Sequence, residues 1–331
     1  MNDVRIFVTG VGGGGGGEQI LKALRLSLLN YYIVGGDITP YSKGLYMVDK
    51  AYILPPALSS DYLDVLLNIC TKENIQALFT GSEPELKIVS KNRCLFENIG
   101  VKLFINPESV IDICLDKFQT MNWFKDNGFS FPKTITVNCF DDLELVDFFP
   151  VVLKPSVGGG GSTNTFIAQD RKELDLFASY LLHIYSQFII QEYVGNANGE
   201  YTVGVLSDME GNLINSIAVK KNILGGLSNR LKVKSKFNDE LLVISNGISQ
   251  GEIGKFPIVT QQCELVAQKL GSTSAINIQC RLVDDKCYIF EINPRFSGTT
   301  SLRAMVGYNE PDVLIRKYIL GEHITPNFPY K

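Results

Sequence analysis

The sequence predicts an α/β fold that begins with an open parallel sheet and continues as an α+β structure. Strand-like and helix-like segments alternate over the first hundred residues, and a βαβα order requires parallel strands with helices on both faces. The rest of the chain departs from this alternation, and its last third begins with three successive strands. The chain has 331 residues, 45% hydrophobic and 20% charged, which is ordinary for a globular protein of two or three domains.

The first domain is predicted to span residues 1–112. A β-rich run is followed by a glycine-rich turn and an amphipathic helix. Tyr62, Leu66 and Ile69 then recur at helical spacing in a second helix. The expected strands are Val4–Thr9, Tyr31–Gly35, Ala77–Thr80 and Lys102–Ile105, and the expected helices are Glu18–Leu28 and Asp61–Glu73.

A change of pattern after Pro107 predicts two further domains, residues 113–195 and 196–331. Gly128 and Gly271 follow helical segments, as glycine often does at a helix C-terminus. The expected strands are Thr134–Val137, Val151–Lys154, Thr165–Ala168, Phe188–Glu192, Glu200–Ser207, Ile214–Lys221, Arg230–Lys234, Ala275–Leu282 and Lys286–Asn293. The expected helices are Lys117–Asn127, Arg171–His183, Pro257–Leu270 and Pro311–Gly321, with a short helix before Val151.

The composition argues against several classes of function. A net charge of −4 gives no electrostatic footprint for nucleic acid or an anionic membrane, and no apolar stretch approaches the roughly 20 residues that span a bilayer. Seven cysteines form no C-x-x-C pair, which favours reduced thiols and a cytoplasmic location. Only two histidines are present, which argues against zinc sites and Ser-His-Asp triads.

A run of six glycines, Gly12–Gly17, follows the first strand. Gly10, Gly12 and Gly15 satisfy G-x-G-x-x-G, and Asp37 closes the second strand, as in a dinucleotide-binding domain. A six-glycine run satisfies this motif in more than one register, so its spacing carries little information. Two other interpretations stay open, a tight turn that lets strand and helix pack closely and a cradle for an anionic substrate.

A second glycine run, Gly158–Gly161, follows an apolar strand that ends in Lys154. This run lies between two predicted strands, so it is not a P-loop, which opens a helix. A glycine hairpin still offers backbone N–H groups to phosphates, and the lysine at its root supplies a positive charge. The alternative is a surface hairpin with a solvated lysine.

The predicted hairpin near the C-terminus carries three oxygen-bearing side chains, Gln279, Glu291 and Asn293. A three-residue turn at 284–286 would place Gln279 opposite Glu291, whereas a two-residue turn would pair it with Phe290, which is expected to face the core. Three such groups on one face suit a Mg²⁺ ion that also binds phosphate and water. Arg295 and Arg303 follow and would neutralise charge during phosphoryl transfer. The alternative is a solvated strand end with a salt bridge.

Together these segments resemble the ATP-grasp superfamily. Lys154-Pro155, the glycine hairpin, Gln191-Glu192-Tyr193-Val194, Glu200 and Glu291-Ile292-Asn293-Pro294-Arg295 occur in the order of that fold. The chain is most similar to the carbamoyl-phosphate-synthase-like, PylC-like branch. The resemblance covers nearly the whole chain and implies a Rossmann-like pre-ATP-grasp domain at the N-terminus that binds no dinucleotide.

The resemblance implies roles for individual residues. The residues implied in ATP binding are Lys117, Lys154, Gly158, Gly159, Gly160, Gly161, Ser162, Gln191, Glu192, Tyr193, Val194 and Glu200. The implied metal ligands are Gln279, Glu291 and Asn293, and Arg295 would stabilise the reacting phosphoryl and acyl groups. Gly12, Gly13, Gly226 and Arg230 are expected on the substrate side.

The resemblance implies an ATP-dependent carboxylate–amine ligase that forms an amide through an acyl phosphate and releases ADP and phosphate. ATP and two Mg²⁺ ions, for which Mn²⁺ would substitute, are the implied cofactors. The implied partners are a small carboxylate, a small amine and a second copy of the chain. The alternatives are an NAD(P)-dependent oxidoreductase that uses the first glycine run, a carbamoyl-phosphate-synthase-like enzyme acting on bicarbonate, and an ATP-binding regulatory protein.

Overall fold

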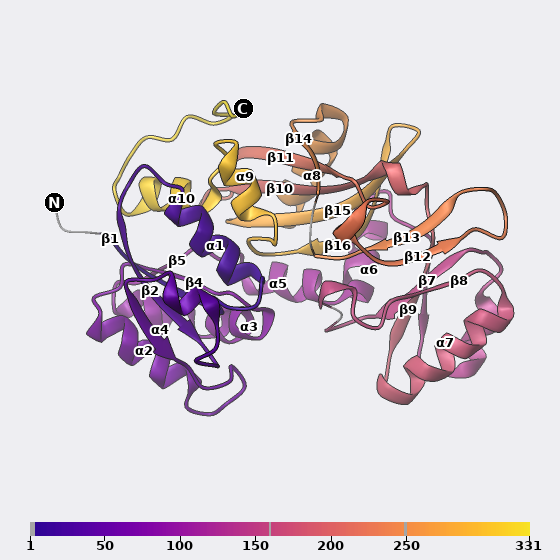
Figure 1. Cartoon of the computed structure of the whole chain (residues 1–331), viewed down its shortest axis with the longest axis horizontal. Coiled ribbons are helices and arrows are strands. Elements are labelled where there is room, and N and C mark those ends of the chain that lie inside the picture. The colour runs from indigo at the N-terminus through magenta and orange to yellow at the C-terminus, as the bar shows by residue number, and fades with distance from the viewer. Residues whose placement is uncertain (1–3, 159, 248–249) are drawn as a thin grey trace.

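The computed structural model describes residues 4–158, 160–247 and 250–331. Its N-terminal part is a parallel sheet of strand order β3-β2-β1-β4-β5, with helices around it (Figure 1). The strands are β1 (Val4–Thr9), β2 (Tyr31–Asp37), β3 (Lys50–Ile53), β4 (Ala77–Phe79) and β5 (Lys102–Leu103). The helices are α1 (Gly16–Arg25), α2 (Tyr62–Lys72), α3 (Glu83–Lys91), α4 (Arg93–Asn98) and α5 (Glu108–Leu115). The predicted parallel sheet is confirmed, but β3 and α3–α5 were not expected.

The middle part is an antiparallel sheet of order β6-β9-β7-β8. Its strands are β6 (Thr134–Val137), β7 (Val151–Pro155), β8 (Phe166–Ala168) and β9 (Phe188–Glu192), and its helices are α6 (Lys117–Asn127) and α7 (Arg171–Ile184). Gly128 ends α6 with a φ of 72°, the left-handed conformation expected of glycine there. Leu174, Ala178 and Leu181 of α7 pack onto the sheet, in a core formed by residues 137–190.

The C-terminal part is an antiparallel sheet of order β14-β11-β10-β15-β16. Its strands are β10 (Glu200–Ser207), β11 (Leu213–Lys221), β14 (Gly251–Gly254), β15 (Ala275–Val283) and β16 (Lys286–Asn293). Strands β12 (Asn229–Lys234) and β13 (Leu241–Ser245) form a separate hairpin, and the helices are α8 (Pro257–Leu270), α9 (Thr300–Met305) and α10 (Glu310–Tyr318). Val203, Val205 and Ile278 pack against α8, so the residues between them on β10 and β15 face the other way.

The β15–β16 hairpin does not have the three-residue turn that would pair Gln279 with Glu291 in a regular ladder. Val283 pairs with Lys286, so the turn contains two residues, Asp284 and Asp285, both with positive φ. A bulge then shifts the register between Gln279 and Cys280, and Gln279 pairs with Glu291. Of the two turns considered, the two-residue turn is therefore present, and the bulge still gives the pairing of Gln279 with Glu291.

The N-terminal and C-terminal parts share one hydrophobic core. Ile20 and Leu24 of α1 belong to the same buried cluster as Tyr308 and Ile315, and Figure 1 shows α1 beside α9 and α10. The Tyr31 hydroxyl donates to Asp312, with the two oxygens 2.5 Å apart. In the described residues, no helix has both the length and the apolarity needed to cross a membrane.

Candidate active site

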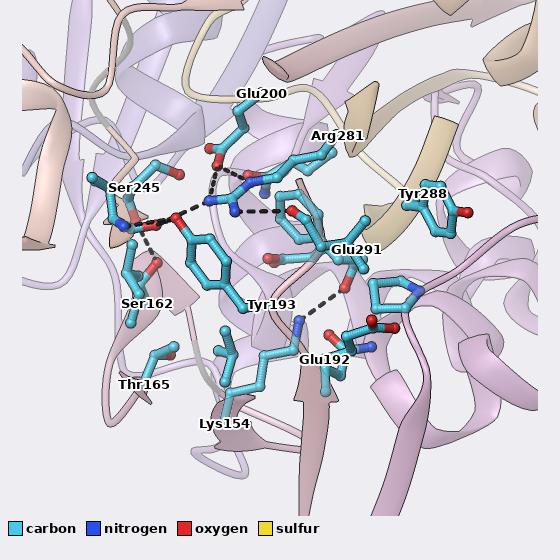
Figure 2. A pocket seen from close by; sticks show the side chains of 18 of the residues that line it. Lys154, Ser162, Thr165, Glu192, Tyr193, Glu200, Ser245, Arg281, Tyr288 and Glu291 are labelled. Carbon is cyan, nitrogen blue, oxygen red and sulfur yellow. Dashed lines mark hydrogen bonds and ion pairs between the residues drawn. The ribbon is translucent and has the colours of Figure 1, made fainter. Parts of the chain in front are cut away.

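A cavity of about 700 Å³ lies between the β6–β9 sheet and the C-terminal sheet (Figure 2). Part of this volume is open to the solvent. Many of the residues that resemble ATP ligands line it: Lys117, Lys154, Ser162, Gln191, Glu192, Tyr193, Val194, Glu200, Gln279 and Glu291. These residues come from segments up to about 170 positions apart, so the fold gathers them as the resemblance implies.

Lys154 is buried at the end of β7 and is only 6% exposed. Its Nζ donates to the Phe290 carbonyl oxygen at 2.9 Å. Burial and the nearby charge of Lys117 lower the pKa of Lys154 to about 7, although Glu291 and Glu200 act in the opposite direction. Glu291 and Glu200 compensate the positive charge of Lys154 only in part. A bound phosphate group would place negative charge directly beside the ammonium group and favour its protonated form.

A second, smaller cavity of about 270 Å³ shares Lys117 and Glu291 with the first. Glu83, Gly158, Gly160 and Asn293 also line it. Lysine, glycine backbone, carboxylate and amide groups therefore converge at one end of the larger cavity. This end has the donors and acceptors that a polyphosphate with bound cations requires.

Lys117 reaches this position because its helix is capped beside β7. The Asp116 carboxylate accepts from the Phe118 N–H at 2.9 Å and from the Ser156 hydroxyl at 2.5 Å. The Lys117 N–H also donates to the Ser156 carbonyl oxygen at 2.9 Å. The start of α6 is thus held against the strand that carries Lys154.

The predicted metal ligands lie on adjacent strands. The bulge places Gln279 beside Glu291, and Asn293 lies further along the same strand, with its Oδ1 3.1 Å from Arg295 Nη2. No group of three His, Cys, Asp or Glu side chains within the described residues is arranged to hold a metal. A divalent cation at this site would depend on one carboxylate, amide oxygens and phosphate oxygens, which is a donor set suited to Mg²⁺.

Arg295 also connects the hairpin to the N-terminal domain. Its Nη2 lies 3.3 Å from Glu83 Oε1, at the first residue of α3. Both side chains are partly exposed, and Glu83 lines the smaller cavity. Arg295 is therefore positioned beside the predicted metal ligands, with an acidic partner from another domain.

The hinge after β9 has a free donor. Within the described residues, the Val194 N–H makes no hydrogen bond, whereas the neighbouring Tyr193 N–H donates to the Pro150 carbonyl oxygen at 3.0 Å. The Gln191 amide is buried and donates to the Thr134 hydroxyl at 3.0 Å. A free backbone N–H at a cavity wall fits the adenine contact that the resemblance implies.

The second glycine run connects β7 and β8. Gly158 and Gly161 have φ values of 79° and 65°, which residues other than glycine rarely adopt. Ser162 follows, and its hydroxyl donates to the Ser245 carbonyl oxygen at 2.8 Å. The predicted contact at Gly159 lies outside the described residues.

Arg303, which was expected to be catalytic, lines neither of the two cavities, and its catalytic role stays a prediction. It is 1% exposed, lies 3.4 Å from Glu310 and donates to Asn277 Oδ1 at 2.6 Å. The guanidinium packs against Gly204, where an added Cβ would lie 2.2 Å from Nη1. The buried charge of Arg303 is paired with Glu310, as a charge at this depth requires.

The two predicted substrate residues after β11 lie elsewhere. Gly226 begins a 3₁₀ turn, Gly226–Ser228, before β12. Arg230 lines a different, open pocket together with Phe166, Phe177 and Tyr180. The structure does not bring Arg230 to the cavity that holds Lys154, and a substrate role for these residues stays a prediction.

The first glycine run is occupied by carboxylates of its own domain. The Gly12 N–H donates to Asp37 at 2.8 Å, and the Gly14 N–H donates to Glu18 at 2.6 Å. Asp37 therefore caps the loop and is not directed at a ribose. This geometry does not support dinucleotide binding. Gly12 and Gly13 were expected to bind substrate, but the Gly12 N–H already donates to Asp37.

Sequence reasoning missed Arg281, Tyr288, Phe290 and Glu83, which all line one of the two cavities. Arg281 follows Gln279 by two positions on β15, so strand alternation could have placed both on the same face. Phe290 was expected in the core, but the bulge turns it toward the cavity. Glu83 could not be found this way because its partner, Arg295, lies 212 residues away.

Two sheets that enclose a cavity lined by lysines, a backbone hinge and a carboxylate–amide set define a nucleotide-binding protein of the ATP-grasp class. The family model of the ATP-grasp domain matches residues 114–299, and that of the PylC-like N-terminal domain matches residues 7–104. The chain belongs to the ATP-grasp family. The predicted resemblance and fold class are confirmed.

The chain is similar to part of several longer curated proteins. The carbamoyl phosphate synthase large chain of Pyrococcus furiosus is 23% identical over 305 residues, which is 88% of this chain and 27% of the relative. The alpha-aminoadipate–LysW ligase LysX of Sulfurisphaera tokodaii is 29% identical over 163 residues, which is 46% of this chain and 56% of the relative. The chain thus spans about a quarter of the carbamoyl phosphate synthase chains that it matches.

Solved structures share the fold over nearly the whole chain. The L-amino acid ligase from Bacillus licheniformis superposes with a TM-score of 0.68 and 17% identity, covering 98% of this chain and 78% of the ligase. At this level of identity, the likeness concerns the fold.

Proposed function

We propose that the protein is an ATP-dependent ligase that joins a small carboxylate to a small amine. The observation that carries the proposal is the register shift that sets Gln279 beside Glu291, at the end of the cavity where Lys117 and Gly158 also lie. This arrangement gathers cationic and cation-binding groups at one end of the cavity, and the hinge with Val194 forms another part of its lining. An ATP molecule lying between them would present its phosphates to the charged end.

The reaction divides into two displacements. The substrate carboxylate attacks the γ-phosphorus of ATP, the bond to the β–γ bridging oxygen breaks, and ADP leaves with an acyl phosphate in place. The amine then attacks the acyl carbon, phosphate leaves, and the amine loses a proton. Such phosphoryl transfer requires positioning and charge neutralisation, not a protein nucleophile.

Side chains of the two cavities, together with Arg295, would meet these requirements. Lys154 and Lys117 neutralise the phosphates, and Arg295 neutralises the acyl phosphate. Glu83, beside Arg295, would accept a hydrogen bond from the incoming neutral amine. Gln279, Glu291 and Asn293 would hold Mg²⁺, which neutralises phosphate charge when bound.

The test is a phosphate-release screen over pairs of carboxylates and amines with Mg²⁺-ATP, with bicarbonate and ammonia as one pair. We expect ADP and phosphate to form in equal amounts with an amide product. Hydroxylamine in place of the amine should yield an acyl hydroxamate, which reports the acyl phosphate. Release of AMP and pyrophosphate would contradict the mechanism.

Glu291→Ala is the matched control for this screen. It removes the one carboxylate of the metal set and should abolish phosphate release, while the thermal unfolding midpoint changes little. Retained turnover in this variant would contradict the metal assignment. Nucleotide binding without phosphate release for any pair would favour the regulatory alternative, and turnover of bicarbonate alone would favour the carbamoyl-phosphate-synthase-like one.

A further inference from the structure

A buried guanidinium group links the two ends of the proposed nucleoside site. Arg281 is 7% exposed and lies with its guanidinium carbon 4.2 Å from the centre of the Tyr193 ring (Figure 2). Its Nη1 donates to the carbonyl oxygen of Val194 at 3.1 Å, and its Nη2 donates to that of Val243 at 3.0 Å. Arg281 therefore ties the hinge to the β12–β13 hairpin.

The same guanidinium binds one oxygen of Glu200. The Nε and Nη2 atoms of Arg281 lie 3.3 and 3.1 Å from Glu200 Oε2. The other oxygen, Oε1, is buried and accepts no hydrogen bond within the described residues, although the Lys221 ammonium lies 3.5 Å away. A buried acceptor without a donor is costly, so a hydroxyl group of a ligand would satisfy Oε1.

Charge keeps Glu200 ready to accept such a donor. Burial alone would raise its pKa, but the charges of Arg281 and Lys221, together with side-chain hydrogen bonding by Ser245 and Arg281, lower the pKa below its usual value. Glu200 is only 2% exposed and lines the same cavity as Val194. The carboxylate thus stays ionised beside the place where a ribose would follow an adenine bound at the hinge.

We propose that Arg281 is a positioning residue for ribose recognition. By holding Oε2, it directs Oε1 of Glu200 toward a ribose hydroxyl, and by holding the Val194 carbonyl oxygen it fixes the distance between the base contact and the ribose contact. This inference rests on the proposed function, because it takes ATP as the ligand. Its consequence is that discrimination between ATP and deoxyATP depends on a residue that need not touch the nucleotide.

The experiment measures the dissociation constants of ATP, 2′-deoxyATP and 3′-deoxyATP with Mg²⁺ by isothermal titration. The wild-type protein should bind at least one deoxy analogue about tenfold or more weakly, because a hydrogen bond to a buried carboxylate is lost. Arg281→Lys keeps the charge but loses the planar fork. In this variant, the affinity for ATP should fall about tenfold and the affinity for deoxyATP by less than about threefold. The difference in affinity between ATP and deoxyATP therefore disappears.

A matched control separates positioning from stability. Arg303→Lys alters another buried arginine–glutamate pair, with Glu310, that does not line the cavity. It should lower the thermal midpoint and leave the ratio of ATP to deoxyATP affinity unchanged. Glu200→Gln should reduce the ratio as Arg281→Lys does.

The outcomes are distinct. If Arg281→Lys weakens all three nucleotides by one common factor, or leaves the wild-type ratio intact, the positioning role is wrong while the proposed function stands. Equal wild-type affinity for all three nucleotides would likewise overturn the inference. If the wild-type protein binds no nucleotide, the proposed function itself fails. Arg281→Met, tested at a temperature where the variant is folded, replaces the lysine variant if that variant does not fold.

Discussion

The pKa of Lys154 makes nucleotide binding depend on pH. In the free protein, burial and Lys117 lower this pKa to about 7. Bound phosphates would return it toward the usual value of about 10.4. The bound state therefore holds more protons than the free state between these two values, and affinity for Mg²⁺-ATP should fall as pH rises through 7.

The size of the effect follows from the protonated fraction of the free lysine. With a pKa of about 7, about half of the lysine is protonated at pH 7 and about 3% at pH 8.5, so affinity should fall about fifteenfold over this interval. At pH 8, binding should take up about 0.9 proton per nucleotide. Titration calorimetry in buffers of different ionisation enthalpy measures this uptake directly.

Two variants of Lys154 isolate its contribution. Lys154→Arg stays charged throughout this range, and Lys154→Gln is never charged, so both should lose the proton uptake that the wild-type protein shows. The uptake that remains in Lys154→Gln belongs to the nucleotide phosphates and is subtracted. Equal uptake in the wild-type protein and Lys154→Arg, or an affinity change below about twofold between pH 7 and 8.5, would refute the reasoning.

Three further predictions concern the fold. Arg303→Met should lower the free energy of unfolding in urea by about 3–5 kcal/mol, because Glu310 is left buried without its partner; unchanged stability would contradict a structural role. Gly17→Ala should lower the thermal midpoint, because its Cβ would lie 2.1 Å from a backbone carbonyl oxygen, whereas Gly15→Ala meets open space and should match the wild-type protein. Asp285→Gly should raise the free energy of unfolding by about 1 kcal/mol, since φ is 61° at this turn position; Asp285→Ala, measured alongside, should not.

Elements with local end signals were predictable from the sequence. The helices α6 and α8 have the predicted bounds because Gly128 and Gly271 end them with left-handed conformations. The short edge strand β14 was missed because pairing with β11 holds it in place. An added Cβ at Gly251 would lie 1.9 Å from the Lys220 carbonyl oxygen, so glycine is present there for close approach, and that requirement exists only in the folded sheet.

The candidate site was predictable where one strand or one motif carried it. Lys154, Gln191, Glu200 and Glu291 line one cavity as the resemblance implied. The exact pairing of the hairpin was not predictable, because a two-residue turn and a bulge together give the same register at Gln279 as a three-residue turn. Turn length alone therefore decides neither the register nor which side chains face the cavity.

The two glycine runs have opposite physical reasons. In the first, Gly12 is required because an added Cβ would lie 2.3 Å from the Ser42 hydroxyl oxygen, and Asp37 occupies its N–H. In the second, Gly158, which lines the smaller cavity, and Gly161 meet open space and take positive φ, and no carboxylate of the described chain occupies their N–H groups. Motif spacing does not distinguish these situations, because both runs supply amides. The distinction depends on whether a distant side chain has already satisfied those amides, so an anion-binding role is supported for the second run and not for Gly12.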